Sequence, residues 1–114
     1  MIKNEYLEIK KFQVQNNEQP KMLLWSVFAG SKGCINRTKI VLQLRDTPLN
    51  TNQLSEKLGL DYKVVQRHIE ILRKNNLLET VGNRYGEIYF LSPAFESNQD
   101  IFNEATKSKK CRQN

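Results

Sequence analysis

The sequence predicts a small, mainly helical α+β domain in which helices are followed by one β-hairpin. Its 114 residues suit one domain, since single domains most often contain roughly 100–150 residues. Apolar side chains recur at helical spacing over residues 34–75. Two β-prone segments, at 77–81 and 87–91, then flank a polar turn bounded by glycines. The predicted order is therefore helix, helix, turn, helix, hairpin.

The first predicted helices follow the loop that Pro20 closes. Residues 22–29 form a short apolar helix ending at Gly30. Residues 34–45 form the next helix, in which Arg37 lies one turn before the apolar stripe. That stripe consists of Ile40, Val41 and Leu44.

A shorter helix is predicted after Pro48, because proline cannot continue the helix that precedes it. Asn50 is a good N-cap, and Gln53 stands three residues later in the capping-box position. The apolar face is formed by Leu54 and Leu58. Gly59 ends the helix.

The third helix of this core runs from about residue 61 to 75 and has two unlike faces. Its buried arc is formed by Val65, Ile69 and Leu72. The opposite face is long, polar and mainly basic, and contains Lys63, Gln66, Arg67, Glu70 and Lys74. His68 borders the buried arc, so a packed or capping histidine is favoured over a DNA contact.

The chain divides into three predicted parts. Residues 1–21 form an N-terminal extension, residues 22–92 the domain itself, and residues 93–114 a C-terminal helix and tail. A docking stripe on the last helix is predicted from Phe95, Ile101, Phe102 and Ala105.

Composition excludes several classes of function. The longest apolar run is far shorter than a membrane-spanning helix, and no secretory leader is expected, so we predict a cytoplasmic protein without a membrane partner. Cys34 and Cys111 are far apart and His68 is the one histidine, which argues against a metal site, a disulfide framework or a catalytic constellation. We therefore expect free thiols, no cofactor and no enzyme activity; an intersubunit bridge through Cys111 stays open.

A short helix, a turn and a longer helix form a helix-turn-helix. Ser55 allows the two helices to approach closely, and Gly59 provides a turn without a Cβ atom. The second helix of such a pair enters the DNA major groove. Base-contacting candidates are therefore Lys63, Gln66 and Arg67, because Gln and Arg bond adenine and guanine through paired hydrogen bonds.

Further side chains are candidates for contacts with the DNA backbone. They are Thr51, Asn52, Tyr62 and Lys74 around the helix pair and, less firmly placed, Lys32, Arg37 and Lys39. In the hairpin, Arg84 could reach the minor groove, while Asn83 and Tyr85 brace against the backbone.

The segment from Leu54 to Leu72, followed by Asn76-Leu77-Leu78, resembles the winged helix-turn-helix segment of ArsR-like transcription regulators. Residues 48–54 and 86–92 make it most similar to the archaeal ArsR-like proteins. The resemblance implies a winged helix-turn-helix that binds double-stranded DNA as a homodimer. It also implies that Lys63, Gln66 and Arg67 read bases and that Arg84 lies in the wing. Metal-sensing members carry paired cysteines where this chain has Leu60-Asp61-Tyr62, so metal sensing at that place is disfavoured.

A homodimer implies a seam between subunits, formed by the terminal segments. The apolar surplus outside the helix-turn-helix suggests that the seam includes Leu24, Trp25, Phe28, Ile101 and Phe102. The sequence does not identify a small-molecule effector.

A second class of function stays open, that of a winged helix used for protein interaction with weak or no DNA binding. Glu70 interrupts the basic face, and residues 51–92 carry six Lys/Arg against five Asp/Glu. The net charge of +6 and pI near 9.4 favour contact with a polyanion but do not locate it.

Overall fold

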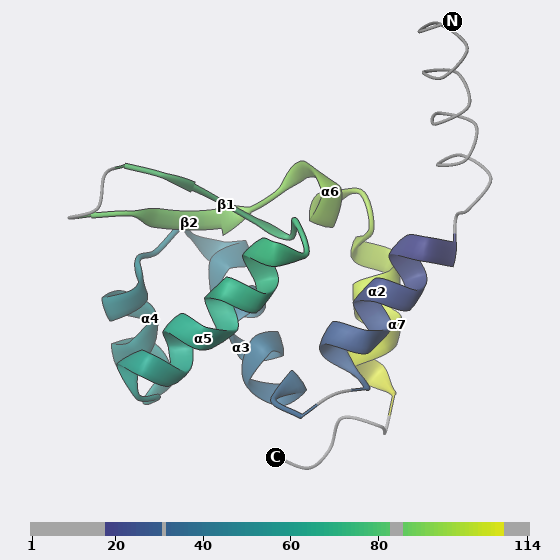
Figure 1. Cartoon of the computed structure of the whole chain (residues 1–114), viewed down its shortest axis with the longest axis horizontal. Helices are drawn as coiled ribbons and strands as arrows, with labels where there is room; N and C mark the ends of the chain where they lie inside the picture. The colour runs from purple at the N-terminus through teal and green to yellow at the C-terminus, as the bar shows by residue number, and fades with distance from the viewer. Residues whose placement is uncertain (1–17, 31, 83–85, 109–114) are drawn as a thin grey trace, which may run out of the picture.

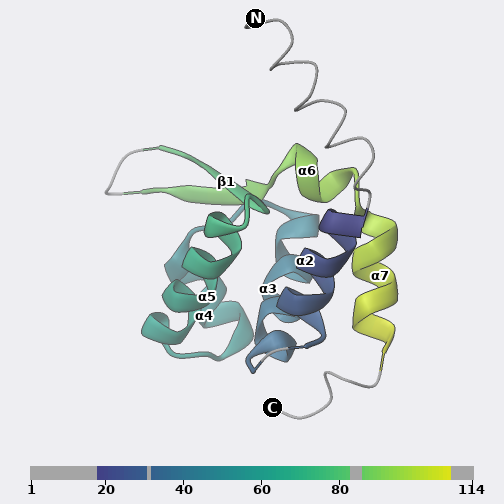
Figure 2. The same ribbon diagram turned by 45° about the vertical axis from the view of Figure 1, so that its right-hand side comes forward.

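Helix α3 (Cys34–Asp46) lies at the centre of the fold. The computed structural model describes residues 18–30, 32–82 and 86–108. Figure 2 shows α3 between helix α5 (Tyr62–Lys74) on one side and helix α2 (Glu18–Phe28) on the other. Its apolar stripe is buried as predicted, because Ile40, Val41 and Leu44 are at most 4% exposed. Helices α2, α4 and α5 and the second strand of the hairpin all contact this helix.

Helix α4 (Thr51–Leu58) and α5 form the predicted helix-turn-helix. The two helices contact each other, and both contact α3. The wedge between them is closed by side chains at most 1% exposed, namely Leu54, Val65, Ile69 and Leu72. Burial of this apolar wedge fixes the rotation of α5 about its axis, so its polar side faces outward.

A β-hairpin follows α5 and extends away from the helices (Figure 1). Strands β1 (Leu78–Val81) and β2 (Ile88–Leu91) pair antiparallel, with Leu78 opposite Leu91. Leu49, just before α4, adds a bridge to β2 through two backbone hydrogen bonds with Tyr89, at 2.9 and 3.3 Å. This bridge fastens the root of the hairpin to the start of α4. Three helices with such a hairpin make the fold a winged helix-turn-helix, as predicted.

The C-terminal part of the described chain packs back onto the helical layers. Helix α7 (Gln99–Lys107) lies beside α2 in both views (Figures 1 and 2). It follows a short helix α6 (Pro93–Glu96), which the Ser92 hydroxyl caps by accepting from the N–H of Phe95. The docking stripe expected on one last helix is therefore divided, with Phe95 on α6 and its other members on α7.

Three phenylalanines from three helices form one aromatic cluster. The ring centroid of Phe102 lies 4.8 Å from that of Phe28 and 5.0 Å from that of Phe95, both in edge-to-face geometry. All three rings are at most 1% exposed. Edge-to-face pairs at such distances add to the stabilisation from apolar burial. The cluster joins α2, α6 and α7 within one chain.

The same burial corrects part of the expected subunit seam. Leu24, Phe28 and Phe102 are 1%, 0% and 1% exposed, so they offer no surface to a second subunit. The prediction is wrong for these three because their apolar surface is already covered by their own chain. Trp25 and Ile101 are only half-buried and pack at the edge of the core.

Candidate nucleic-acid interface

The start of α4 is built by a reciprocal cap. The side-chain oxygen of Asn50 accepts from the backbone N–H of Gln53 at 2.7 Å. The side-chain oxygen of Gln53 accepts in turn from the backbone N–H of Asn50 at 2.9 Å. The predicted capping box is therefore confirmed. It leaves the N-terminus of α4, where the helix dipole favours anions, at the protein surface beside the wing.

The turn between the two helices depends on the backbone of Gly59. Its φ is +67°, and a Cβ atom built there would meet nothing within 4 Å. Glycine is thus needed for the left-handed conformation and not for space, which refines the predicted steric reason. Ser55 closes the turn, because its carbonyl accepts from the N–H of Leu60 at 3.1 Å and its hydroxyl donates to the Leu60 carbonyl.

Helix α5 presents a polar face to solvent. The carboxylate of Asp61 caps its start by accepting from the N–H of Lys63 at 3.0 Å. The exposed side chains of the helix, apart from Tyr62, are Lys63, Gln66, Arg67, Glu70, Arg73 and Lys74. Five of these six can donate hydrogen bonds, and four carry positive charge. The face therefore suits an acceptor-rich, anionic surface.

A buried polar pair holds α5 against α3. The Nη1 of Arg37 lies 3.2 Å from Nδ1 of His68, and the two side chains are 3% and 7% exposed. Arg37 also donates from Nε to the carbonyl of Val27 and from Nη2 to that of Lys32, each at 3.0 Å. Burial lowers the pKa of Arg37, but a guanidinium keeps its charge at neutral pH.

His68 is the packed histidine that the sequence favours. Burial, and then the charges of Arg37 and Arg67, lower the pKa of His68 below its usual value near 6.5. The neutral ring therefore packs behind the exposed face of α5. The φ of Gly33 is +86°, and a Cβ atom built there would lie only 2.7 Å from Cε1 of His68. Gly33, Arg37 and His68 thus form one close-packed support for the helix.

A polar hollow of about 200 Å³ joins α4, α5 and the hairpin. It is lined by Asn50, Thr51, Asn52, Tyr62, Gln66, Gly86, Glu87 and Tyr89. The hydroxyl of Tyr89 donates to Oε1 of Glu87 at 3.0 Å. Burial, and next the hydrogen bond to Glu87, raise the pKa of the Tyr89 hydroxyl. The hollow makes the N-terminal ends of both helices and the hairpin root one continuous surface.

Sequence reasoning missed Glu87 and Tyr89 as parts of this surface. The signal was present, because residues two apart in a strand point to the same side. Glu87 also brings a negative charge to this hollow, whose other described lining residues are neutral.

The other side chains predicted to contact the DNA backbone differ in their exposure to solvent. Exposed side chains are those of Lys32, Lys39, Asn52, Tyr62 and Lys74. Arg37 is buried and bonded internally, so the prediction that it contacts DNA is corrected. Thr51 is also buried, at 7% exposed, so the prediction that its side chain contacts DNA is corrected too. The wing candidates Asn83, Arg84 and Tyr85 lie outside the described residues.

The described part of the chain holds neither a metal-binding cluster nor a membrane-spanning helix. There, no group of three or more His, Cys, Asp or Glu side chains could hold a metal ion. No helix among those residues is long and apolar enough to cross a membrane. Cys34 is disulfide-bonded, which corrects the expected free thiol, because separation along the sequence does not set the distance between two sulfurs. Cys111 lies outside the described residues.

Comparison with known families supports the helix-turn-helix assignment. Residues 35–80 match the family model described as "Bacterial regulatory protein, arsR family". This match covers α3, α4, α5 and the first strand of the hairpin. The predicted ArsR-like resemblance is confirmed, while its archaeal subgroup stays a prediction. No curated protein matches the chain significantly.

Several solved structures with a similar fold are described as transcription regulators. Reduced HlyU from Vibrio cholerae is 22% identical with a TM-score of 0.61, over 82% of this chain and 88% of that one. A probable transcriptional regulator from Pseudomonas aeruginosa is 20% identical with a TM-score of 0.60, over 85% and 76%. A MarR mutant from E. coli, complexed with operator DNA, is 15% identical with a TM-score of 0.52, over 91% and 75%. At these identities the likeness shows the fold alone.

Proposed function

We propose that this chain, whose residues 35–80 carry the arsR-family pattern within a winged helix-turn-helix, is a sequence-specific, double-stranded-DNA-binding transcription regulator that acts as a homodimer. In this proposal α5 enters the major groove, and the wing, residues 82–86, contacts the minor groove. The observation that carries it is the outward polar face of α5, set beside the capped N-terminus of α4 and the hairpin root. The buried wedge supports it by holding that face in one orientation.

Base recognition is assigned to the N-terminal half of α5. Lys63, Gln66 and Arg67 are all exposed and lie on consecutive turns of a helix whose other side is buried. Gln bonds adenine and Arg bonds guanine in bidentate fashion, each worth roughly 1–3 kcal/mol of discrimination. These three residues therefore set which sequence is preferred.

Contacts with phosphates are assigned around this helix. The exposed candidates are Asn52, Tyr62, Lys74, Lys32 and Lys39. The wing residues Asn83, Arg84 and Tyr85 complete the proposed contact at the minor groove. Such contacts position a protein on the duplex and contribute to all sequences alike.

The proposed dimer seam uses the outer side of α2 and α7. Met22 is 68% exposed, and Trp25 and Ile101 are half-buried at the edge of the core. The indole N–H of Trp25 is buried and has no hydrogen-bond acceptor among the described residues. A second subunit could cover Met22 and the exposed parts of Trp25 and Ile101. Symmetry would place the two recognition helices about one DNA turn, roughly 34 Å, apart.

DNA recognition is tested by selecting bound duplexes from a random pool and comparing variants on the selected site and on random sequence. Arg67→Ala should weaken binding to the selected site by about 5- to 150-fold and binding to random duplex much less. Lys39→Ala should weaken both about equally. Lys107→Ala, an exposed lysine of α7 outside the proposed face, is the matched control. Equal losses on both duplexes for Arg67→Ala would remove this side chain from base readout.

The seam is tested by sedimentation equilibrium of the full chain. Met22→Glu and Trp25→Ala should each raise the dimer dissociation constant at least tenfold. Glu79→Gln, at an exposed position of β1 away from α2 and α7, should leave it unchanged. A wild-type chain that sediments as a monomer at every concentration tested contradicts the homodimer.

A protein-interaction module is the second candidate, favoured by two carboxylates. Glu70 is exposed on α5, and Glu87 lines the polar hollow. The salt dependence of duplex binding separates the two functions. A DNA binder loses affinity with a slope of about −0.9 per phosphate contacted in a plot of log K against log salt. A slope near zero, or no binding at low salt, favours the interaction module.

A further inference from the structure

The carboxylate of Glu87 is a negative charge on the surface that we propose to face DNA. It lines the polar hollow between α4, α5 and the hairpin, and its Oε1 accepts from the Tyr89 hydroxyl at 3.0 Å. Among the described residues, no lysine or arginine lines this hollow. A carboxylate repels the phosphates of a duplex, so Glu87 weakens binding to any sequence unless the DNA offers it a hydrogen-bond donor.

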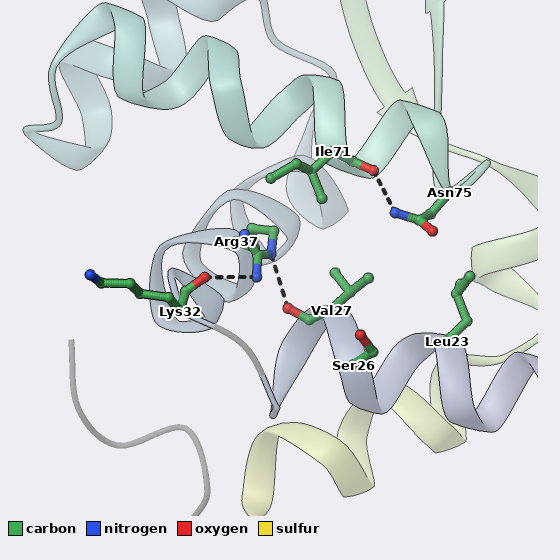
Figure 3. A pocket seen from close by; sticks show the side chains of 7 residues that line it. All are labelled: Leu23, Ser26, Val27, Lys32, Arg37, Ile71 and Asn75. Atoms are coloured by element: carbon green, nitrogen blue, oxygen red, sulfur yellow. Dashed lines mark hydrogen bonds between the residues drawn. The ribbon is translucent and has the colours of Figure 1, made fainter.

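A charged side chain can be bonded within its own chain, and Arg37 is an example. Figure 3 shows its guanidinium bonded to the backbone carbonyls of Val27 and Lys32. Glu87 differs, because a carboxylate has about four lone-pair positions and the Tyr89 hydroxyl occupies one of them. The other positions can accept from a group outside the chain.

The phenol that holds this carboxylate is itself fixed. Tyr89 is 7% exposed, and its backbone N–H and carbonyl bond the carbonyl and N–H of Leu49 at 2.9 and 3.3 Å. The guanidinium of Arg73, on α5, lies 6.0 Å from the centroid of the Tyr89 ring. These contacts connect Tyr89 to the segment before α4 and to α5, so the Glu87 carboxylate keeps a defined position relative to the recognition helix.

Gln66 lines the same hollow and lies on the exposed face of α5. We assign this side chain to base reading in the major groove, so a base edge that it contacts also lies near Glu87. The amine donors on that edge are N4 of cytosine and N6 of adenine. The adenine amine lies between two acceptors, its own N7 and O4 of the paired thymine, which repel a carboxylate. The cytosine amine has an acceptor on one side only, O6 of the paired guanine, and therefore suits Glu87 better.

We propose that Glu87 is a specificity-determining residue, whose carboxylate accepts a hydrogen bond from the N4 amine of a cytosine at or next to the base pair that Gln66 contacts. This inference rests on the proposed DNA-binding function. On a site with that cytosine, the hydrogen bond offsets the repulsion between the carboxylate and nearby phosphates. On other sequences the repulsion remains, so Glu87 raises the ratio of specific to non-specific affinity by weakening the non-specific complex.

The test compares wild type with Glu87→Gln, which keeps the size of the side chain and removes its charge. Each protein is used to select duplexes from a random pool. Fluorescence anisotropy then measures affinity for the selected site, for its single-base variants and for random duplex. In wild type, replacing one cytosine of the site should weaken binding at least about fivefold. In Glu87→Gln the same replacement should weaken binding less than about twofold, and random duplex should bind at least about threefold more tightly.

Two further variants separate the position of the charge from its presence. Glu79→Gln makes the same charge change at an exposed position of β1, opposite Phe90 and hence on the other face of the hairpin from Tyr89. It should keep the cytosine preference and change affinity for random duplex less than about twofold. Tyr89→Phe keeps the Glu87 charge but removes the hydroxyl that holds it, so the cytosine preference should weaken without tighter binding to random duplex.

An unchanged base preference in Glu87→Gln overturns the inference, as do equal effects of Glu87→Gln and Glu79→Gln. In either case wild type still binds its selected site, and the proposed regulator function stands. A wild type that binds no duplex, even at low salt, overturns the proposed function and this inference with it.

Discussion

Replacement of Phe102 by alanine tests whether α7 belongs to the core of the single chain. The ring is 1% exposed, lies 4.8 and 5.0 Å from its two aromatic partners, and has the guanidinium of Arg45 at 5.5 Å from its centroid. Burying a phenylalanine is worth about 3–5 kcal/mol relative to alanine. Each aromatic pair adds about 0.5–1.5 kcal/mol within this neighbourhood. We therefore expect Phe102→Ala to lower the free energy of unfolding by about 4–5 kcal/mol.

The assay is equilibrium urea denaturation, followed by far-UV circular dichroism at two protein concentrations about tenfold apart. A side chain buried within one chain gives the same loss at both concentrations. Phe102→Leu keeps most of the apolar volume and should lose about 1–3 kcal/mol, the aromatic contribution alone, which keeps the test informative if the alanine variant does not fold. A loss below about 2 kcal/mol for Phe102→Ala, or one confined to the lower concentration, would refute the reasoning.

Three further predictions concern the residues that support the proposed interface. Gly33→Ala should lower the free energy of unfolding in the urea assay by at least about 1–2 kcal/mol, because φ is +86° and the new Cβ meets His68. Gly86→Ala has open space around it, so in the same assay it should leave the free energy of unfolding almost unchanged. Asn50→Ala removes the α4 cap and should lower the free energy of unfolding, measured by thermal denaturation, by about 1 kcal/mol. Asn50→Ser keeps a capping oxygen and should lower it less. Burial lowers the pKa of His68, so the unfolded chain binds a proton that the folded chain does not. The contribution of the neutral His68 ring to the free energy of unfolding is complete above about pH 6.5. It declines as the pH falls through that value toward the lower pKa of the folded state. The urea midpoint of wild type should therefore decrease over this window, whereas that of His68→Gln should change less.

Local patterns predicted most of the helix-turn-helix. The Asn50–Gln53 capping box and Gly59 mark the two ends of α4, and both signals act within a few residues. The long helix was expected from about residue 61 to 75 and runs from Tyr62 to Lys74. Its buried arc follows from periodicity alone, because an apolar stripe must face other protein.

Long-range pairing explains what the sequence did not predict. Periodicity shows that Phe28 and Phe102 have apolar neighbours but not whether those neighbours belong to the same chain. Phe95 was expected on the last helix, yet the cap at Ser92 places it on a separate turn. The proposed division of the chain at residues 22 and 93 stays a prediction.

Charge was the least reliable guide to the candidate site. Arg37 was counted as a surface cation, although its place one turn before Val41 put it near the apolar stripe of its helix. Two of its partners are backbone carbonyls, and a sequence pattern does not show which side chain will bond to a carbonyl. Glu87 was overlooked because the hairpin was interpreted through its tip and not through the side of the strand that faces α4.

The bonds of Arg37 have a consequence for how the molecule opens. Its guanidinium connects the end of α2, the loop before α3 and the middle of α5 through Val27, Lys32 and His68. Separating any one of these segments would leave part of a charged group in the interior without its bonding partner, which is costly. Partial opening is therefore suppressed, and the amide hydrogens of the three helices should exchange with solvent through a single, cooperative unfolding event.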